Sequence, residues 1–136
     1  SQIKKLQAYI LNEIAPLEEA IKKYPVNILV GASGSSESYA RMIGHRESGR
    51  DPLRGKSTYI FKLKSYFDLH SELLRSTRKE RTAMKGLVRM RVDMIVLASI
   101  TTHLVLKQFG FKKMLLSTFA LKEGAAFRIA KGMPLP

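Results

Sequence analysis

The sequence has no cysteine, few acidic residues and no uninterrupted apolar run of membrane-spanning length. The absence of cysteine excludes a disulfide-stabilised scaffold and a cysteine-ligated zinc site, and it is consistent with a reducing compartment. The first residues enter a helical pattern directly, without the apolar core of a signal peptide. We therefore expect a cytoplasmic protein.

The most apolar stretch, residues 92–109, is interrupted by polar and charged side chains. These are Asp93, Ser99, Thr101, Thr102, His103 and Lys107. A membrane span needs about 20 mainly apolar residues with interfacial anchors, and this stretch has neither. It therefore predicts a central helix packed on a sheet, and we expect no membrane partner.

Basic residues dominate the charge of the chain. Its 136 residues include 24 Lys and Arg against 11 Asp and Glu, which gives a formal net charge of +13. Such an excess attracts polyanions such as nucleic acid, polyphosphate, phosphorylated nucleotides or anionic lipid, without selecting among them. The length suits one ordinary core, so residues 1–136 are expected to form a single unit.

Two short apolar runs predict the strands of a helix-rich α/β fold. Residues 26–30 show no clean alternation of apolar and polar side chains, which favours a strand buried on both faces. Residues 113–117 predict a second buried strand, whereas residues 58–61 predict only a brief extended segment. Because two strands are poor cover for four or more helices, we expect that part of the fold lies upstream of this chain.

Apolar residues at helical spacing account for much of the remaining sequence. A kink is expected at Pro16. Gly86 is expected to end one long helix, with Leu74 on its buried face and Leu69 nearer the edge. The expected helices span residues 3–24, 36–43, 66–84, 92–109 and 121–130. Residues 44–57 contain three glycines and a proline without periodicity, so they predict a basic, mobile loop.

A Gly/Ser-rich turn, Gly-Ala-Ser-Gly-Ser-Ser at residues 31–36, lies between the first strand and a helix. Glycines permit close backbone approach, and the amides at a helix N-terminus point outward with the positive end of the helix dipole. A phosphate oxygen suits such a turn. The spacing matches neither a Walker loop, a dinucleotide fingerprint nor a nucleophile elbow. The alternative is an ordinary connection in which Ser35 or Ser36 caps the helix.

A cluster of seven basic residues follows in the middle of the chain, opposed there only by Glu80. The cluster comprises Arg75, Arg78, Lys79, Arg81, Lys85, Arg89 and Arg91. Like charges at helical spacing repel one another, so an anionic partner would relieve the repulsion; a solvated helix face is the alternative. No aromatic residue lies between Phe67 and Phe109 to stack a base, which argues against nucleic acid.

The three histidines predict neither a metal site nor a catalytic group. His45, His70 and His103 are scattered along the chain. Asp68 and Glu72 flank His70 at spacings that point in different directions on a helix. We therefore expect no metal bound by this chain, and the spacing supports no Ser/His/Asp grouping.

Three separated blocks occur in order along the chain: ILVGASGS at 28–35, GL at 86–87 followed by RVDMI at 91–95, and LLSTFALKEG at 115–124. Together they resemble the Ppx/GppA family, the exopolyphosphatases and guanosine pentaphosphate phosphohydrolases. Ser35 stands where the family often has threonine, and Lys122 where arginine is usual. The resemblance implies a partial actin-like, ribonuclease-H-type ATPase subdomain, with this chain as the C-terminal portion of the second subdomain.

The resemblance also implies roles for individual residues. The implied phosphate-binding residues of a second phosphate loop are Gly31, Ser33, Gly34 and Ser35. Arg91 and Arg89 would contact the substrate anion. Asp93 would orient Arg91 or cap a helix, and Glu123 would be structural at a helix start, with Gly124 allowing close packing.

The function implied by the resemblance is part of a phosphoanhydride hydrolase. It would release terminal phosphate from inorganic polyphosphate or from guanosine penta- or tetraphosphate, such as pppGpp. The first phosphate loop and the catalytic glutamate would lie in an N-terminal subdomain upstream of this chain. We therefore expect the chain alone to be inactive, with Mg²⁺ bound only in the complete enzyme.

Two questions stay open at this point. The sequence does not mark an oligomeric state, which leaves a homodimer open. The alternative function is a non-catalytic basic module that binds nucleic acid or senses phosphorylated nucleotides.

Overall fold

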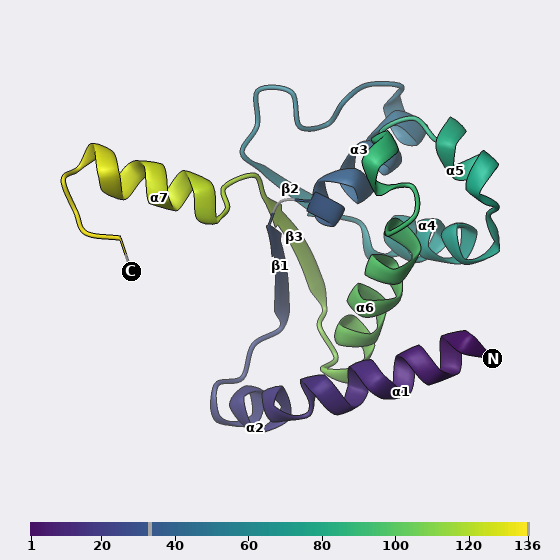
Figure 1. The fold of residues 1–136 in the computed structure, drawn as a ribbon, viewed down its shortest axis with the longest axis horizontal. Coiled ribbons are helices and arrows are strands. Elements are labelled where there is room, and N and C mark those ends of the chain that lie inside the picture. The colour runs from purple at the N-terminus through teal and green to yellow at the C-terminus, as the bar shows by residue number, and fades with distance from the viewer. Residues whose placement is uncertain (33, 136) are drawn as a thin grey trace.

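A computed structural model describes residues 1–32 and 34–135 and shows a small sheet with helices packed on one side (Figure 1). The helices are α1 (Gln2–Ile14), α2 (Pro16–Lys23), α3 (Gly34–Ser48), α4 (Leu63–Arg75), α5 (Arg78–Ala83), α6 (Ile95–Gln108) and α7 (Leu121–Ala130), with a 3₁₀ turn, η1, at Arg89–Arg91. The strands are β1 (Ile28–Ala32), β2 (Thr58–Phe61) and β3 (Lys113–Ser117). The expected helix-rich α/β fold is confirmed.

The sheet is mixed, with the order β1-β3-β2. The central strand β3 pairs in parallel with β1 and antiparallel with β2. The segment at 58–61, expected to be only briefly extended, is thus a third strand. β3 has a neighbouring strand on each side. Its residues alternate between the two faces of the sheet, and Met114 and Leu116 on the core face are fully buried.

The first strand differs from the expectation in both position and burial. It spans Ile28–Ala32 and not 26–30, and it is an edge strand whose residues alternate between partly buried and exposed. Ile28 and Val30 are exposed, while Leu29 packs against the core. The prediction of burial on both faces was therefore wrong for this chain, since a short apolar run does not itself show how many neighbours cover the strand.

α3 is longer than the helix expected at 36–43, so residues 44–48 are helical and do not belong to a loop. Gly44 was expected to be the first residue of the loop. It is instead a packing position, because a Cβ there would lie 2.5 Å from the Cδ of Pro52. The helix ends four residues later, where the Ser48 hydroxyl donates to the Gly44 carbonyl at 2.9 Å.

The irregular segment that follows, residues 49–57, is held at its middle. Asp51 accepts a hydrogen bond from the Leu53 amide at 2.9 Å and contacts Arg41 at 3.4 Å. The Leu53 side chain is buried in the core cluster. These contacts anchor the centre of the basic loop; its expected mobility stays a prediction.

The single long helix expected over 66–84 is two helices, α4 and α5. The chain is extended at Ser76 and Thr77, and Thr77 caps α5 in a capping box: its amide donates to the Glu80 carboxylate at 2.6 Å. The buried face also differs, because Leu69 is fully buried while Leu74 is 37% exposed. A T-x-x-E capping box inside a helical pattern marks this break.

The core lies between the sheet and the helices α3, α4 and α6. Tyr39 of α3 and Tyr66 of α4 meet edge to face, with ring centroids 5.4 Å apart. α6 is the central helix expected over 92–109, although it begins only at Ile95; Ile95 and the preceding Val92 are both buried. None of the helices in the described residues is long and apolar enough to cross a membrane.

Gly86 forms a tight turn after α5 and does not end that helix. Its φ is +90°, and a Cβ at this position would lie 2.6 Å from the carbonyl carbon of Arg41. The segment between α5 and η1 therefore lies directly against the backbone of α3. This packing places η1 beside the N-terminal half of α3.

Candidate functional site

The Gly/Ser-rich turn lies where β1 ends and α3 begins. β1 ends at Ala32 and α3 begins at Gly34, whose φ of +43° is in the left-handed region. Ser33, one of the predicted phosphate-binding residues, lies outside the described residues. The predicted residues Gly31, Gly34 and Ser35 all lie at this junction of strand and helix.

Gly31 is required by packing within the turn. A Cβ at this position would lie 2.7 Å from the Cβ of Ser36, so glycine lets the first turn of α3 fold back over the end of β1. A compact strand-to-helix connection results. The outward-pointing amides of the first helical turn are thereby presented at the sheet edge.

The alternative in which Ser35 or Ser36 caps the helix does not hold. Because α3 already begins at Gly34, both serines lie within its first turn and not at the capping position. Both are partly exposed. Their hydroxyls lie beside the amides that carry the positive end of the helix dipole.

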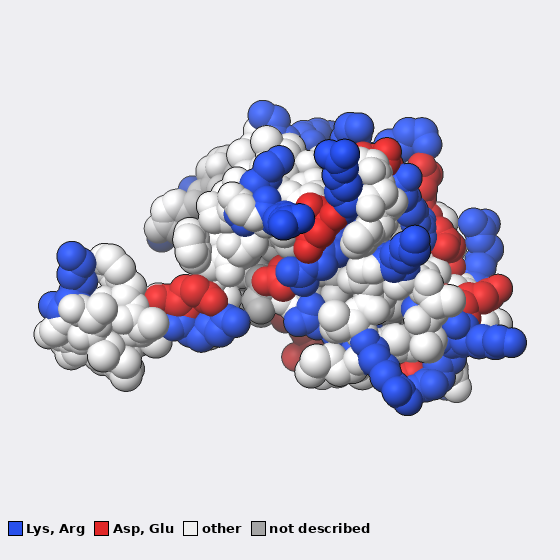
Figure 2. Space-filling model, turned by 90° about the horizontal axis from the view of Figure 1, so that it is seen from above, with Lys and Arg blue, Asp and Glu red and all other residues white. Residues whose placement is uncertain are grey.

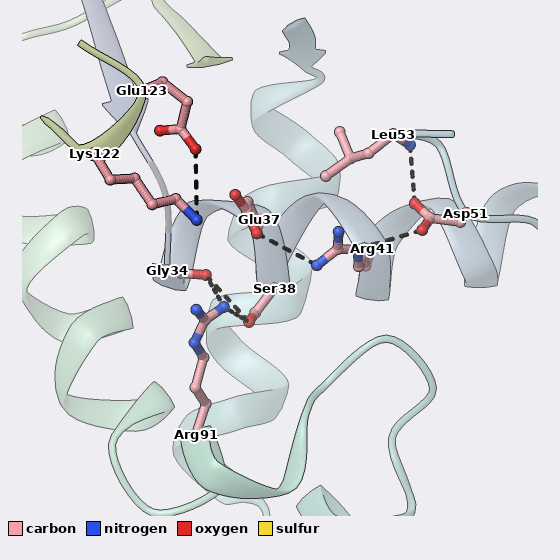
Figure 3. Close-up of polar contacts among 9 residues, drawn as sticks. All are labelled: Gly34, Glu37, Ser38, Arg41, Asp51, Leu53, Arg91, Lys122 and Glu123. Carbon is pink, nitrogen blue, oxygen red and sulfur yellow. Dashed lines mark hydrogen bonds and ion pairs between the residues drawn. The ribbon is translucent and has the colours of Figure 1, made fainter. Parts of the chain in front are cut away.

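Arg91, which is distant in sequence, contacts the first turn of α3 (Figure 3). Its Nη1 donates to the carbonyl oxygen of Gly34 and, at 3.1 Å, to the hydroxyl of Ser38. The residues are 57 and 53 positions apart in sequence. Arg89, the other predicted anion contact, is exposed two residues earlier at the start of η1. The structure thus brings a guanidinium to the predicted phosphate turn.

Asp93 has a different partner from the one expected. Its carboxylate accepts hydrogen bonds from Arg78 at 2.8 and 3.4 Å, and these lower its pKa. It does not orient Arg91, and α6 begins after Met94 without a side-chain cap. The break between α4 and α5 explains the difference, because it brings Arg78 over the start of α6.

The start of α7 lies close to the same turn in Figure 3. Glu123 accepts a hydrogen bond from the Ala120 amide at 2.8 Å, which lowers the pKa of its carboxyl, and Lys122 contacts Glu123 at 3.5 Å. Figure 3 shows the Lys122 ammonium directed towards the start of α3. Gly124 has open space around it, so the close packing expected there is not seen.

Two further residues of α3 belong to the site and were missed by the sequence analysis. Ser38 joins the contact with Arg91, and Arg41 pairs with Glu37 at 3.4 Å. The signal was available, since Glu37 and Arg41 are four residues apart and such pairs form on a helix. The Arg41 partner offsets the negative charge that Glu37 places near the turn.

Tyr39 lies one helical turn after Ser35, on the side of α3 that faces the core. It is fully buried, and burial raises its pKa to about 12, an effect that the nearby hydroxyls of Thr102 and Ser35 offset in part. Within the described residues its Oη makes no hydrogen bond of normal geometry. The phenol therefore stays protonated at any physiological pH.

The described residues hold no ready-made cluster of metal-ligating side chains. They contain no group of three or more His, Asp or Glu side chains that could hold a metal ion. His70 and His103 do meet, but as stacked rings with centroids 4.2 Å apart and planes inclined by 9°, which cannot converge on one ion. A Mg²⁺ ion would find no carboxylate cage in this part of the chain.

Solved structures match this chain over nearly its whole length. A crystal structure of an exopolyphosphatase from Cytophaga hutchinsonii matches 98% of this chain with a TM-score of 0.90 and 29% sequence identity. An Aquifex aeolicus member of the Ppx/GppA protein family matches 98% of it with a TM-score of 0.75 and 16% identity. No protein-family model and no curated protein matches the chain.

The chain spans less than half the length of either structure, 43% of the first and 42% of the second. Within that span the fold of 98% of this chain is matched in both structures. The resemblance to the Ppx/GppA family, first seen in three short sequence blocks, is thereby confirmed in three dimensions.

Proposed function

We propose that this chain forms part of a phosphoanhydride hydrolase that releases terminal phosphate from inorganic polyphosphate or from guanosine penta- or tetraphosphate. The observation that carries the proposal is the convergence of Arg91 with the first turn of α3. The likeness to an exopolyphosphatase supports the same reaction class. On this proposal the turn holds substrate phosphate.

Three kinds of donor would act on one phosphate group. The first-turn amides of α3 point out of its N-terminus, and the Ser35 hydroxyl, which also lies near the Tyr39 phenol, is a further donor. The Arg91 guanidinium adds a fixed positive charge. Both of its contacts with α3 use Nη1, so Nη2 and Nε are the candidate donors to a phosphate oxygen. This arrangement binds and orients an anion and stabilises charge that develops on it.

The wider surface would draw in a highly charged substrate. Figure 2 shows Lys and Arg side chains spread over much of the visible face of the body, so the positive charge forms a broad field and not one cluster. A field of this kind raises the local concentration of polyanions. It does not distinguish polyphosphate from a guanosine polyphosphate.

The reaction itself needs a group from outside this chain. The carboxylates at the turn, Glu37 and Glu123, are engaged with Arg41 and with the Ala120 amide, so neither is placed to activate water. We propose that a carboxylate of an N-terminal subdomain acts as the general base and that the complete enzyme uses Mg²⁺. We propose that the chain alone is inactive.

The test is phosphate release by the longer protein, supplied with Mg²⁺ and either polyphosphate or guanosine pentaphosphate. Release from either substrate supports the proposal. Binding of both without release from either, by a protein with an intact fold, would favour a non-catalytic sensor of phosphorylated nucleotides. Arg91→Ala should weaken the use of both substrates.

A further inference from the structure

Tyr39 carries a buried phenol hydroxyl that has no role in the proposed reaction so far. Its side chain is fully buried, and within the described residues its Oη makes no hydrogen bond of normal geometry. A buried hydroxyl is normally paired, because burial removes the water that would otherwise satisfy it. The Tyr39 hydroxyl is thus a donor that is still available to another group.

The geometry of α3 directs Tyr39 towards the Gly/Ser turn. Ser35 and Tyr39 are four residues apart on α3, which places them on the same face of the helix. Long side chains on a helix lean back towards its N-terminus, so the Tyr39 ring leans towards Ser35. The Ser35 hydroxyl and the Thr102 hydroxyl of α6 both lie near the Tyr39 Oη. The phenol therefore lies between two hydroxyls, one of which belongs to the predicted phosphate turn.

Packing holds the Tyr39 ring in this place. Tyr66 meets it edge to face, with ring centroids 5.4 Å apart. Tyr66 is itself anchored, because its Oη donates to the Ser99 carbonyl at 3.1 Å. Rotation of Tyr39 out of the core would expose a fully buried aromatic ring, which is unfavourable. The Tyr39 hydroxyl therefore has little freedom to find a partner away from Ser35 and Thr102.

We propose that Tyr39 is a positioning residue whose Oη donates to the Ser35 hydroxyl when an anion occupies the turn, and so directs the Ser35 hydrogen to the anion. A serine hydroxyl has one hydrogen and two lone pairs. When Tyr39 donates to one lone pair, the Ser35 hydrogen is left for a phosphate oxygen, which accepts it. The inference rests on the proposal that this turn holds substrate phosphate.

The chemistry of the three hydroxyls suits this role. Burial raises the pKa of Tyr39 to about 12, so its Oη keeps the proton that it must donate. Thr102 can donate to the same Oη, which gives a chain that runs from Thr102 through Tyr39 and Ser35 to the anion, and each bond in such a chain strengthens the next. Without an anion nothing selects this direction, in agreement with the unpaired Oη.

The test compares Tyr39→Phe with Tyr66→Phe in the longer protein. Each substitution removes one buried phenol hydroxyl and keeps the ring, but among the described residues only the Tyr66 hydroxyl has a partner. The probe is a non-hydrolysable imido analogue of tripolyphosphate in the presence of Mg²⁺. Its dissociation constant is measured by titration calorimetry, and the melting temperature is measured without the probe.

We expect Tyr39→Phe to raise the dissociation constant about threefold without lowering the melting temperature, because it removes a donor that is unpaired until the anion binds. Tyr66→Phe should do the reverse, with a melting temperature lower by about 2 °C and an unchanged dissociation constant. In a Ser35→Ala background, Tyr39→Phe should have no further effect on the dissociation constant, because Tyr39 acts through the Ser35 hydroxyl.

An unchanged dissociation constant for Tyr39→Phe would overturn the inference, and so would an effect that persists in the Ser35→Ala background. A lower melting temperature without weaker binding would assign Tyr39 a structural role only. If the unmodified protein does not bind the probe, the phosphate turn itself is contradicted, and the inference fails with it. Binding that depends on Tyr39 without any hydrolysis of polyphosphate would remove the proposed activity and leave the inference standing.

Discussion

Two arginines of the same basic stretch, Arg81 and Arg91, have opposite roles in the structure. The Arg81 guanidinium donates to the Val92 carbonyl at 2.9 Å and to the Ser76 carbonyl at 2.6 Å, so it ties the start of α6 to the break between α4 and α5. Arg91 contacts α3 through Nη1 alone. One side chain is used by the fold, and the other is directed to the candidate site.

The difference shows that a count of cations overstates the charge available to a ligand. Of the seven basic residues between 75 and 91, Arg78 is also engaged, by Asp93. From helical spacing alone, Arg78, Arg81 and Arg91 all belong to one basic cluster that could contact an anion. The separation between structural and ligand-facing cations follows only from the break at Ser76 and Thr77, which turns α5 towards α6.

The largest expected effect is that of Gly86→Ala, because Gly86 fixes the segment that leads to both the η1 turn and Arg91. The substitution combines a φ of +90° with a Cβ only 2.6 Å from the backbone of α3. We expect a loss of about 3 kcal/mol or more in the free energy of unfolding. The measurement is thermal or urea denaturation.

Gly110→Ala is the matched control for this prediction. Gly110 has a comparable φ of +64°, but a Cβ there meets open space. Only the conformational strain then applies, and it costs about 1–2 kcal/mol. Equal losses for the two substitutions would show that the contact with α3 does not position this segment.

Arg91→Ala tests the ligand-facing member of the comparison. We expect KM to rise about tenfold or more, since a charged hydrogen bond contributes about 1.5–3 kcal/mol, with a larger effect for the more highly charged substrate. Stability should also fall, because the Gly34 carbonyl and the Ser38 hydroxyl lose their donor in a partly buried position. Arg89→Ala, which removes an exposed charge nearby, should change KM only a few-fold by weakening the general field. Equal effects for both would contradict a specific contact.

Arg81→Ala tests the structural member. Its removal leaves the carbonyls of Ser76 and Val92 without their donor in a partly buried position, which we expect to cost about 1–3 kcal/mol of stability. KM for the properly folded fraction should not change. A raised KM with unchanged stability would reverse the roles assigned to Arg81 and Arg91.

Acid pH tests the helical core independently of Arg81 and Arg91, because guanidinium groups do not change their charge in this pH range. Burial, together with the stacked His103, lowers the pKa of His70 to about 4. The Ser99 hydroxyl lies 3.2 Å from Nδ1, and the Tyr66 ring stacks on the imidazole. Burial, together with Lys107, also lowers the pKa of His103.

Because the pKa of His70 is lower in the folded state than the ordinary 6.5, its neutral form is what the fold accommodates. This contribution to stability is present above pH 6.5 and is lost as the pH falls from 6.5 towards 4. His70→Gln should therefore flatten the decline of the urea midpoint over that range. An unchanged decline would place the acid sensitivity elsewhere.

Ser35→Ala has the smallest expected effect. Ser35 supplies one neutral donor among several, so we expect KM to rise only about threefold to tenfold, in line with about 1 kcal/mol for one hydrogen bond. Stability should be unchanged because Ser35 does not cap α3. A lowered melting temperature with an unchanged KM would restore the capping interpretation.

Sequence patterns predicted the elements whose signals are local. The strand at 113–117 and the helix at 121–130 were predicted with the bounds that the structure shows, and the junction of β1 and α3 falls within the predicted Gly/Ser turn. The extent of α3 and the burial of β1 were not predicted. Both depend on contacts distant in sequence, such as Gly44 against Pro52, and on which neighbours a strand has, which periodicity does not record.

For the candidate site, the sequence indicated Gly34, Ser35 and Arg91 by resemblance but not their geometry. It could not show that Asp93 turns to Arg78, because that pairing requires the break in the preceding helix. Ser38 was missed for a similar reason: a serine inside a helix has no signal until its partner, 53 residues away, is placed.

The link between Arg91 and Gly34 has a consequence for how the chain folds. The two residues are 57 positions apart, so the site is assembled from a long-range contact whose closure is slow relative to the formation of local helices. A chain with its helices formed but β1 and η1 not yet docked would have no complete anion site. An anion that binds at this junction therefore binds the native state and not its precursors, and by mass action it should raise the apparent melting temperature in proportion to the logarithm of its concentration.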